Sequence, residues 1–364
     1  MDFTTSIFGD FAKFRYGKMP KKSSVKENGK YPIYSGYRYV GYYDEYNTEA
    51  NQLIIVARGV GGTGDVKLTK EKCYLTNLSI SVEIDTSIAL PEYLYYYFSI
   101  RNLRYLDSGS AQSQITISDL ARVEIPLPNI EIQKKIVHCL GVLDRKISAN
   151  EAINDNLEQQ ARTLYQRMFI DNPVSEGYMG TLSDIADITM GQSPNGSSYN
   201  EDGNGAVFFQ GRAEFGFRFP SVRLYTTEPK RMACANDTLM SVRAPVGDLN
   251  VAYTDCCIGR GLAAIHSKSN QQSFVLYTMF SLHKQLDVFN GEGTVFGSIN
   301  RTALTELPIF IPSDREIVKF EAIVAPIDAA IRNNYEEICR LEKIRDALLP
   351  KLMSGELDVS AIEL

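Results

Sequence analysis

Two groups of residues in this chain are of types that could do chemistry, and their spacing decides which chemistry is expected. The segment GVGGTG, residues 59–64, is typical of a glycine-rich loop that cradles phosphate groups. Asp65 stands where the G-x-x-x-x-G-K-[ST] pattern needs lysine, so a β-turn is the favoured interpretation. The three histidines are far apart, without a cysteine or carboxylate at ligand spacing: His138, His266 and His283. We expect no catalytic residue and no metal site, while a site assembled from remote residues stays open.

The cysteines and the start of the chain bear on its compartment. Six cysteines in 364 residues are too few for a disulfide scaffold, and only Cys256 and Cys257 lie close together. We expect buried or edge-strand thiols in a reducing environment. No apolar run approaches the length of about 18 residues that a membrane span needs, and Asp2 and Asp10 replace a basic leader segment. The predicted location is therefore the cytoplasm.

Composition and charge limit the class of protein. At 44% hydrophobic and 23% charged residues, the chain is typical of globular proteins, and its length indicates two or three domains. The formal net charge is -6, which argues against binding nucleic acid through charge alone. By segment, the net charge is +1 for residues 1–130, -1 for 131–178, -2 for 179–312 and -4 for 313–364.

The sequence contains a long internal repeat. Residues 9–20, GDFAKFRYGKMP, match residues 183–194, SDIADITMGQSP, and both copies keep the glycine of Gly17 and Gly191. The match resumes where residues 109–128 align without a gap to residues 293–312. A period of this length is far longer than a solenoid repeat and indicates a duplicated domain followed by a connector.

Each copy reads as a small α/β domain. Short apolar runs at residues 53–59 and 238–244 are bounded by glycine or proline and predict strands that end near an arginine. Helix-like runs at residues 93–100 and 274–286 predict one helix beside each sheet.

A helical period follows each domain and predicts two long, paired helices. The residues expected at the helix seam recur at spacings of three and four, and they are Leu140, Leu143, Ile147, Asn150, Asn154, Leu157, Leu164, Val324, Ile327, Ile331, Asn334, Ile338, Leu341 and Leu348. The second helix can return toward the start of the chain only if the pair is antiparallel. A symmetric antiparallel register places Asn154 opposite Asn334, where a buried pair of amides would fix the register. The alternative is that both asparagines are solvated at a frayed position.

These features together resemble a known family. Each domain opens with a [GS]D-[FI]-A-x-[FI]-x-x-G-x-x-P segment and closes with I-P-L-P or I-F-I-P before a long helix, and residues 348–359 read LLPKLMSGELDV. The chain resembles the specificity subunit of a type I restriction-modification enzyme over almost its whole length. The resemblance implies an α+β fold of two repeated α/β target-recognition domains separated by two long antiparallel coiled-coil helices. The domain ranges are 1–130 for the first target-recognition domain, 131–177 for the first spacer helix, 178–312 for the second target-recognition domain, and 313–364 for the second spacer helix and tail.

The resemblance also implies what such a chain does. It implies a non-catalytic subunit that reads a split sequence of double-stranded DNA, one half-site per target-recognition domain. Two methyltransferase subunits would dock on the helices, and restriction and translocase subunits would join them. S-adenosylmethionine, Mg²⁺ and ATP are then expected only in the partner subunits. In agreement, the chain lacks the [ND]-P-P-[YF] segment that holds a flipped adenine.

The DNA-reading residues are inferred from side-chain chemistry within that resemblance. Arginine, asparagine and glutamine read base edges, whereas lysine and hydroxyl side chains mostly hold phosphates. The candidates in the first domain are Lys18, Lys21, Lys22, Ser35, Tyr37, Arg38, Arg58, Asn77, Gln112 and Gln114. The candidates in the second domain are Gln192, Asn195, Gln210, Arg212, Arg218, Arg243, Arg260, Ser298, Asn300 and Arg301. For each of them the competing interpretation is a solvated loop residue or an internal ion pair. Arg58 and Arg243 are the strongest candidates because each ends a repeat-matched apolar strand.

Two other functions fit the same pattern. One is the specificity subunit of a related enzyme in which a single partner polypeptide both cleaves and methylates. The other is a coiled-coil scaffold that presents two protein-binding α/β domains. Salt-sensitive binding to duplex DNA together with an S-adenosylmethionine-dependent partner would exclude the scaffold.

Overall fold

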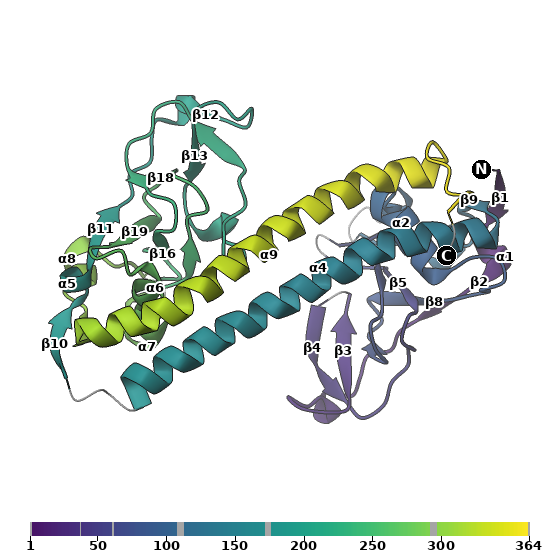
Figure 1. The fold of residues 1–364 in the computed structure, drawn as a ribbon. Coiled ribbons are helices and arrows are strands. Elements are labelled where there is room, and N and C mark those ends of the chain that lie inside the picture. The colour runs from purple at the N-terminus through teal and green to yellow at the C-terminus, as the bar shows by residue number, and fades with distance from the viewer. Residues whose placement is uncertain are drawn as a thin grey trace. The chain divides into compact units, whose positions relative to one another are not determined.

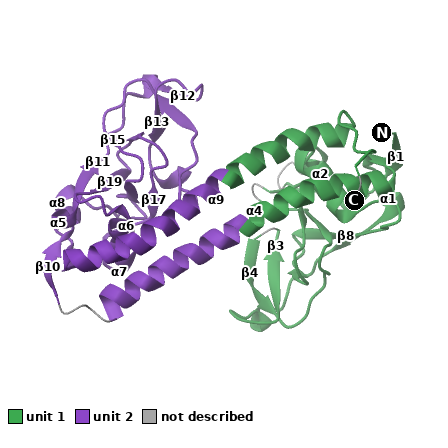
Figure 2. Cartoon of the chain, viewed as in Figure 1, with its two compact units in different colours: residues 1–149, 337–364 green, residues 150–336 purple. Residues whose placement is uncertain are grey.

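A computed structural model describes residues 2–36, 38–59, 62–107, 113–171, 176–291 and 297–362 of the chain (Figure 1). The predicted α+β class is confirmed, with small sheets in each repeat and two long helices. The chain divides into two compact units (Figure 2). Unit 1 comprises residues 1–149 and 337–364, and unit 2 comprises residues 150–336. Each long helix is therefore divided between the two units. The domain ranges predicted from sequence instead treat each helix as a segment of its own.

The described residues of unit 1 form three small sheets. Antiparallel β1 (Phe3–Ile7) and β9 (Glu124–Pro128) close the domain, beside α1 (Phe8–Phe11) and α3 (Ile117–Leu120). A four-stranded antiparallel sheet has the order β2 (Ala12–Tyr16), β8 (Ser79–Ile84), β5 (Leu53–Val56), β6 (Val66–Leu68). A three-stranded sheet has the order β4 (Arg38–Tyr43), β3 (Tyr31–Ser35), β7 (Tyr74–Leu75), with β3 and β7 parallel.

The residues of unit 1 explain why the four-stranded sheet packs on a helix. All four residues of β5, Leu-Ile-Ile-Val, are buried. Helix α2 (Pro91–Ile100) lies across β5 and β6 and buries Tyr93, Leu94 and Phe98 against them. Proline at its first position suits a helix start, because the missing N–H has no partner there.

Unit 2 repeats this plan. Antiparallel β10 (Gly177–Thr181) and β20 (Pro308–Pro312) lie beside α5 (Leu182–Ile185) and α8 (Arg301–Thr305). The four-stranded sheet has the order β11 (Ala186–Met190), β19 (Leu262–Ser267), β16 (Thr238–Ser241), β17 (Leu249–Val251). The second sheet has the order β12 (Tyr199–Asn200), β14 (Leu224–Thr226), β13 (Ala206–Phe209), β18 (Cys256–Ile258), β15 (Met232–Ala233), with β13 and β18 parallel.

The helices of unit 2 differ in one respect from the sequence-based expectation. The run at residues 274–286 predicts one helix, but the structure has α6 (Gln272–Ser281) and α7 (His283–Asp287). They meet at Leu282, whose buried side chain packs into the core of the unit. Short 3₁₀ turns complete the two units: η1 (Lys22–Ser24), η2 (Leu103–Leu106), η4 (Gly196–Ser198), η5 (Arg212–Glu214) and η6 (Val288–Asn290).

The two long helices are α4 (Ile130–Tyr165), continued by a π-helical turn η3 (Gln166–Asp171), and α9 (Asp314–Ser354). None of the predicted seam residues is exposed. Leu140, Ile147, Asn150, Asn154, Val324, Ile331 and Ile338 are buried, whereas Leu143, Leu157, Leu164, Ile327, Asn334, Leu341 and Leu348 are half-buried.

Polar contacts show the antiparallel pairing inside each unit. In unit 2, Asn334 Nδ2 donates to Asn154 Oδ1 at 2.9 Å, so the two asparagines placed opposite each other by the symmetric register are hydrogen-bonded. In unit 1, Arg345 of α9 pairs with Asp144 of α4 at 3.1 Å.

Candidate nucleic-acid interface

The loop ends of unit 1 that carry predicted DNA-reading residues lie together. We call residues 17–18, 35–36, 57–58, 75–79 and 114 the first loop cluster. Its backbone bonds run from the N–H of Lys18 to Leu75 O at 3.0 Å, of Arg58 to Leu78 O at 3.2 Å and of Ile115 to Ala57 O at 2.9 Å. The hydroxyl of Ser79 donates to Gly36 O at 2.9 Å. The cluster therefore holds five candidates on one frame: Lys18, Ser35, Arg58, Asn77 and Gln114.

The same frame recurs in unit 2. We call residues 191–193, 210–211, 242–243, 258–262 and 298 the second loop cluster. Its backbone bonds run from the N–H of Gln192 to Ile258 O at 2.9 Å, of Val242 to Gly261 O at 2.9 Å, of Gly261 to Gln210 O at 3.2 Å and of Ile299 to Val242 O at 3.1 Å. The cluster holds Gln192, Gln210, Arg243, Arg260 and Ser298, all exposed.

The two arginines expected to be strongest occupy equivalent places. Arg58 follows β5 and forms an isolated bridge with Gln114, while Arg243 follows β16 and forms one with Ser298. Arg243 is exposed, and Arg58 is half-buried with a buried Nε that has no hydrogen-bond partner among the described residues. A guanidinium is a forked donor that suits the O6 and N7 acceptors of guanine, so base reading by both arginines stays a prediction.

A glycine in each repeat allows its cluster to close. A Cβ at Gly17 would overlap the carbonyl oxygens of Leu75 and Thr76, and a Cβ at Gly191 would overlap the carbonyl of Gly259. The strand that ends at each glycine can therefore pass against the neighbouring strand end only because no side chain is present. The repeated G-x-x-P pattern was the sequence signal for this contact.

The remaining candidates lie outside the two clusters. Lys21, Lys22 and Arg38 are exposed in unit 1, while Asn195, Arg212, Asn300 and Arg301 are exposed in unit 2. Arg212 pairs with Asp248, and Asn300 Oδ1 accepts from the N–H of Ala303 at 2.9 Å as the N-cap of α8. Tyr37 and Gln112 lie outside the described residues. DNA contact by these residues stays a prediction.

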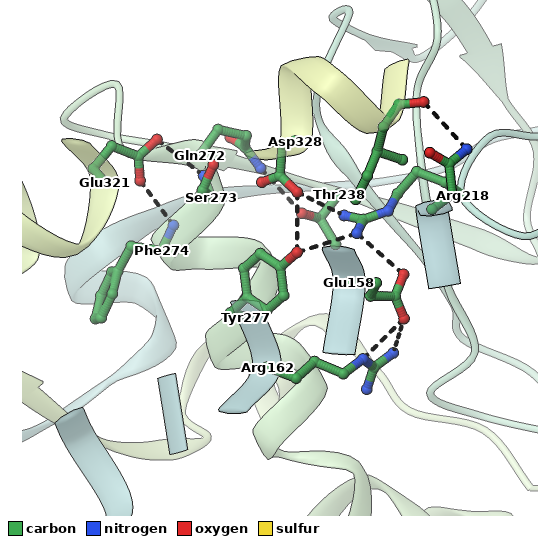
Figure 3. A network of polar contacts seen from close by, with 12 residues as sticks. Glu158, Arg162, Arg218, Thr238, Gln272, Ser273, Phe274, Tyr277, Glu321 and Asp328 are labelled. Carbon is green, nitrogen blue, oxygen red and sulfur yellow. Dashed lines mark hydrogen bonds and ion pairs between the residues drawn. The ribbon is translucent and has the colours of Figure 1, made fainter. Parts of the chain in front are cut away.

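The structure contradicts one candidate. The side chain of Arg218 is only 4% exposed, so it is not available to DNA. Its guanidinium pairs with Glu158 of α4 at 3.1 Å and with Asp328 of α9 at 3.2 Å, and it donates to the Tyr277 hydroxyl of α6 at 3.1 Å (Figure 3). The alternative interpretation, an internal ion pair, is correct for this arginine.

Burial shapes the electrostatics around Arg218. Desolvation raises the pKa of the Asp328 carboxyl, and the adjacent Arg218 guanidinium opposes that shift. Desolvation also raises the pKa of Glu321, whose oxygens accept from the N–H groups of Phe274 and Ser273 at the start of α6. Figure 3 shows both sets of contacts, Arg218 with Glu158, Tyr277 and Asp328, and Glu321 with Ser273 and Phe274.

Sequence reasoning missed the partners of Arg218, although a signal existed. Asp328 repeats Asp144 at the same offset that relates residues 109–128 to 293–312, whereas Tyr277 repeats Tyr93, whose hydroxyl does not bind Asp144. In unit 1, Asp144 accepts from the Tyr96 hydroxyl at 2.5 Å and pairs with Arg345. An aspartate of the helix pair thus binds a tyrosine and an arginine in both units.

The histidines and cysteines all lie in the part of the chain that is described. No group of three histidine, cysteine or acidic residues there could hold a metal ion. His266 Nδ1 contacts the Asp237 carboxylate at 2.5 Å, a pair that sequence spacing did not reveal. The six cysteines are all free. Among the described helices none is both long and apolar enough to cross a membrane.

Comparisons with known proteins agree with this architecture. Residues 2–159 match the family described as the type I restriction modification DNA specificity domain. The chain is 32% identical over 292 residues to the putative type I restriction enzyme MjaX specificity subunit of Methanocaldococcus jannaschii, covering 74% of this chain and 68% of that protein. It is 26% identical over 310 residues to the type I restriction enzyme MjaIX specificity subunit of the same organism, covering 74% and 70%.

A solved structure shares the fold. The crystal structure of a type I restriction-modification system S subunit from M. genitalium matches with a TM-score of 0.66 and 20% identity, covering 96% of each chain. The domain order, the repeated loop clusters and the sequence relatives lead to one assignment. The chain belongs to the family of type I restriction enzyme specificity subunits.

Proposed function

We propose that this chain is the DNA-reading subunit of a type I restriction-modification complex and that each unit reads one half of a split DNA sequence. The observation that carries the proposal is the pair of matched loop clusters, each with an arginine after an equivalent strand. The clusters share a backbone frame but differ in side chains, with Lys18 where the second has Gln192 and Asn77 where it has Arg260. The two loop clusters have the same backbone arrangement but carry different hydrogen-bonding side chains. This combination suits the reading of two different base sequences.

The chain itself contributes no catalysis in this proposal. The sequence lacks the [ND]-P-P-[YF] segment, and its glycine-rich run lacks the lysine of a phosphate loop. S-adenosylmethionine, Mg²⁺ and ATP are held by partner subunits, and the complex works in the cytoplasm. What remains for this chain is recognition and assembly.

Two methyltransferase subunits dock on the helix pair, and restriction and translocase subunits join them. Each unit supports this with large apolar side chains on the outer faces of its helix segments. Val142 and Ile344 of unit 1 are 44% and 48% exposed, while Ile153, Val318 and Ile323 of unit 2 are 47%, 53% and 46% exposed. The reading domains supply few spare cations, with net charges of +1 and -2, so partners must complete the grip on the DNA backbone.

The test compares the purified full-length chain with the chain bound to its coexpressed methyltransferase partner. Labelled methyl transfer and duplex binding are measured at about 50 and 200 mM salt, a range over which phosphate contacts weaken strongly. We expect no methyl transfer by the chain alone, and transfer with salt-sensitive binding by the complex. Turnover by the chain alone would contradict the non-catalytic role. A complex that does not bind duplex DNA would favour the protein scaffold.

A further inference from the structure

A connection present only in the second repeat reaches from the second loop cluster to the helix pair of unit 2. Strands β13 and β14 are joined by residues 210–223, whereas in unit 1 β3 ends at Ser35 and β4 begins at Arg38. The 210–223 connection starts in the second loop cluster, where Gln210 O accepts from the N–H of Gly261 at 3.2 Å. It therefore carries two DNA-reading candidates at its start, Gln210 and Arg212.

The middle of this connection is fixed to both long helices by one side chain. Two different nitrogens of Arg218 serve the two carboxylates: Nη2 lies 3.1 Å from Glu158 of α4, and Nη1 lies 3.2 Å from Asp328 of α9. The Tyr277 hydroxyl completes the set by donating to Asp328 at 3.0 Å. The guanidinium offers donors on two separate nitrogens, whereas a lysine would have to reach both carboxylates from one ammonium nitrogen and could not reproduce this geometry.

Neighbouring contacts hold the same stretch of backbone. Arg218 O accepts from the N–H of Val251 in β17 at 2.8 Å. The next residue, Phe219, is 5% exposed, and its ring lies 4.9 Å from that of Tyr335 on α9. The connection is thus fastened to the four-stranded sheet, to α4 and to α9 before it turns back to β14.

In unit 1 the arginine of the equivalent contact comes from a helix. Arg345 of α9 pairs with Asp144, and no residue of the β3–β4 connection takes part among the described residues. The hydroxyl of Tyr93, which matches Tyr277, is buried there with no hydrogen-bond partner among the described residues. Among the described residues, only the second repeat uses an arginine of its own reading domain to bind the helix aspartate, whereas the first uses Tyr96 of α2.

We propose that Arg218 is a positioning residue that fixes the 210–223 connection, and through it the second loop cluster, on the helix pair of unit 2. This inference rests on the proposed function for its consequence: the second half-site is read at a set distance because the cluster cannot shift along the helices. Charge favours the arrangement, since one buried cation meets two acidic groups. Arg218 acts through the residues it places and does not touch DNA itself.

A distance measurement tests the positioning without DNA. Nitroxide labels are attached at Glu228→Cys, which follows β14, and at Ala322→Cys on α9, both exposed and both in unit 2. The accessible native thiols are removed by Cys139→Ser, Cys234→Ser and Cys339→Ser. We expect a narrow distance distribution in the parent chain and in the control Arg231→Gln, which changes an exposed arginine of the same unit. Arg218→Gln should broaden or shift it, and a distribution superimposable on that of the parent would overturn the proposal.

If Arg218→Gln does not fold, a milder variant still allows the label distance to test the positioning role. Tyr277→Phe keeps the ring in the core and removes only the hydroxyl that joins Arg218 to Asp328. It should broaden the same distribution to a smaller degree. An unchanged distribution in Tyr277→Phe, with Arg218→Gln unfolded, would overturn the positioning role.

The consequence for reading is measured in the assembled methyltransferase complex by modification-sensitive sequencing of methylated DNA. Arg218→Gln should add methylation at sites whose unread gap differs by about one base pair, with the bases of both half-sites unchanged. Arg218→Lys should restore the parent pattern only in part. Lower methylation at the parent sites with no new gap would indicate mere loss of stability and would contradict positioning. Because the label distances need no DNA, failure of the proposed function and failure of this inference are separable.

Discussion

Asn334 on α9 donates a hydrogen bond to Asn154 on α4 at 2.9 Å in the seam of unit 2, whose buried polar residues also include Asn150. Asn154 is 3% exposed, and its own Nδ2 lies 3.5 Å from the carbonyl of Ile331. A shift of either helix by one turn would break the hydrogen bond between the two side-chain amides. The pair therefore selects one antiparallel register over its neighbours.

Removing one asparagine of this pair should lower stability, and removing both should allow the helices to pair in more than one register. Asn334→Leu leaves the buried Asn154 amide without its side-chain partner, so we expect a loss of about 1–3 kcal/mol in the free energy of unfolding. The double variant Asn154→Leu/Asn334→Leu should recover stability but populate more than one register. Urea denaturation gives the stabilities. The exposed neighbour Asn333 supplies the control, because Asn333→Leu should change stability by less than about 0.5 kcal/mol. Equal stability of Asn334→Leu and the parent would show that the amide pair does not stabilise the seam.

The glycines that close the loop clusters should not tolerate a methyl group. Gly191→Ala places a Cβ 2.8 Å from the carbonyl oxygen of Ile258, and the backbone must shift to accept it. We expect about 1–3 kcal/mol of destabilisation and weaker reading of one half-site only. Gly196→Ala is the matched control, since nothing lies within 4 Å of its Cβ position. Thermal unfolding and methylation assays compare the two variants, and equal behaviour would refute the close approach.

The buried thiols should resist modification. Burial raises the pKa of Cys73 and of Cys256 to about 12 in each case, because desolvation disfavours the thiolate. At pH 8 both stay protonated in the folded chain, while the exposed Cys234 is open to reagent. Mass spectrometry after brief treatment with iodoacetamide should find Cys234 alkylated well before the other two. Early modification of Cys256 would contradict its place at the start of β18.

The helices are predicted to set the unread gap, but the structure changes where an insertion must go. The sequence alone would place an insertion near Phe169, at the end of the first connector, yet that ring is 3% exposed and packs 5.5 Å from Phe274 and 5.4 Å from Phe320. An insertion there would disrupt the core of unit 2 and would not simply lengthen the helix. Matched insertions belong after Ala149 in α4 and after Glu336 in α9, at the boundaries between the two units.

Four residues inserted in both helices add about 6 Å and a net rotation of about 40°. One base pair adds about 3.4 Å and about 34°. We therefore expect both half-sites to be kept and the gap to widen by one or two base pairs in sequencing of methylated DNA. Seven residues add about 10 Å with about -20° of rotation, against about 100° for three base pairs, so the heptad variant should be much less active. An unchanged gap in the four-residue variant would show that the helices do not set the spacing.

Much of the fold was accessible from sequence because its signals are local or repeated. The duplication, the helical period and the opposite placement of Asn154 and Asn334 follow from spacing alone. The fate of Arg218 does not, because its burial depends on Glu158 and Asp328, which are remote in the chain. Likewise, the helix breaks at Leu282, a buried residue of the unit 2 core, where no glycine or proline in the sequence predicts a break. The same holds for the candidate DNA-reading residues. Those at strand ends beside a repeated glycine lie in the two loop clusters, whereas those chosen only for their side-chain type lie outside them.

The most direct test of the account is the set of methylated adenines in cells that carry the complex with Arg58→Ala or Arg243→Ala. Each arginine belongs to one loop cluster, and a forked contact to guanine is worth about 1–3 kcal/mol of discrimination. We predict that Arg58→Ala relaxes or abolishes reading of one half-site and that Arg243→Ala affects only the other. Equal weakening at all sequences by both variants would show that these arginines contact phosphates. A methylation pattern unchanged by either variant would contradict the claim that the two loop clusters read the DNA.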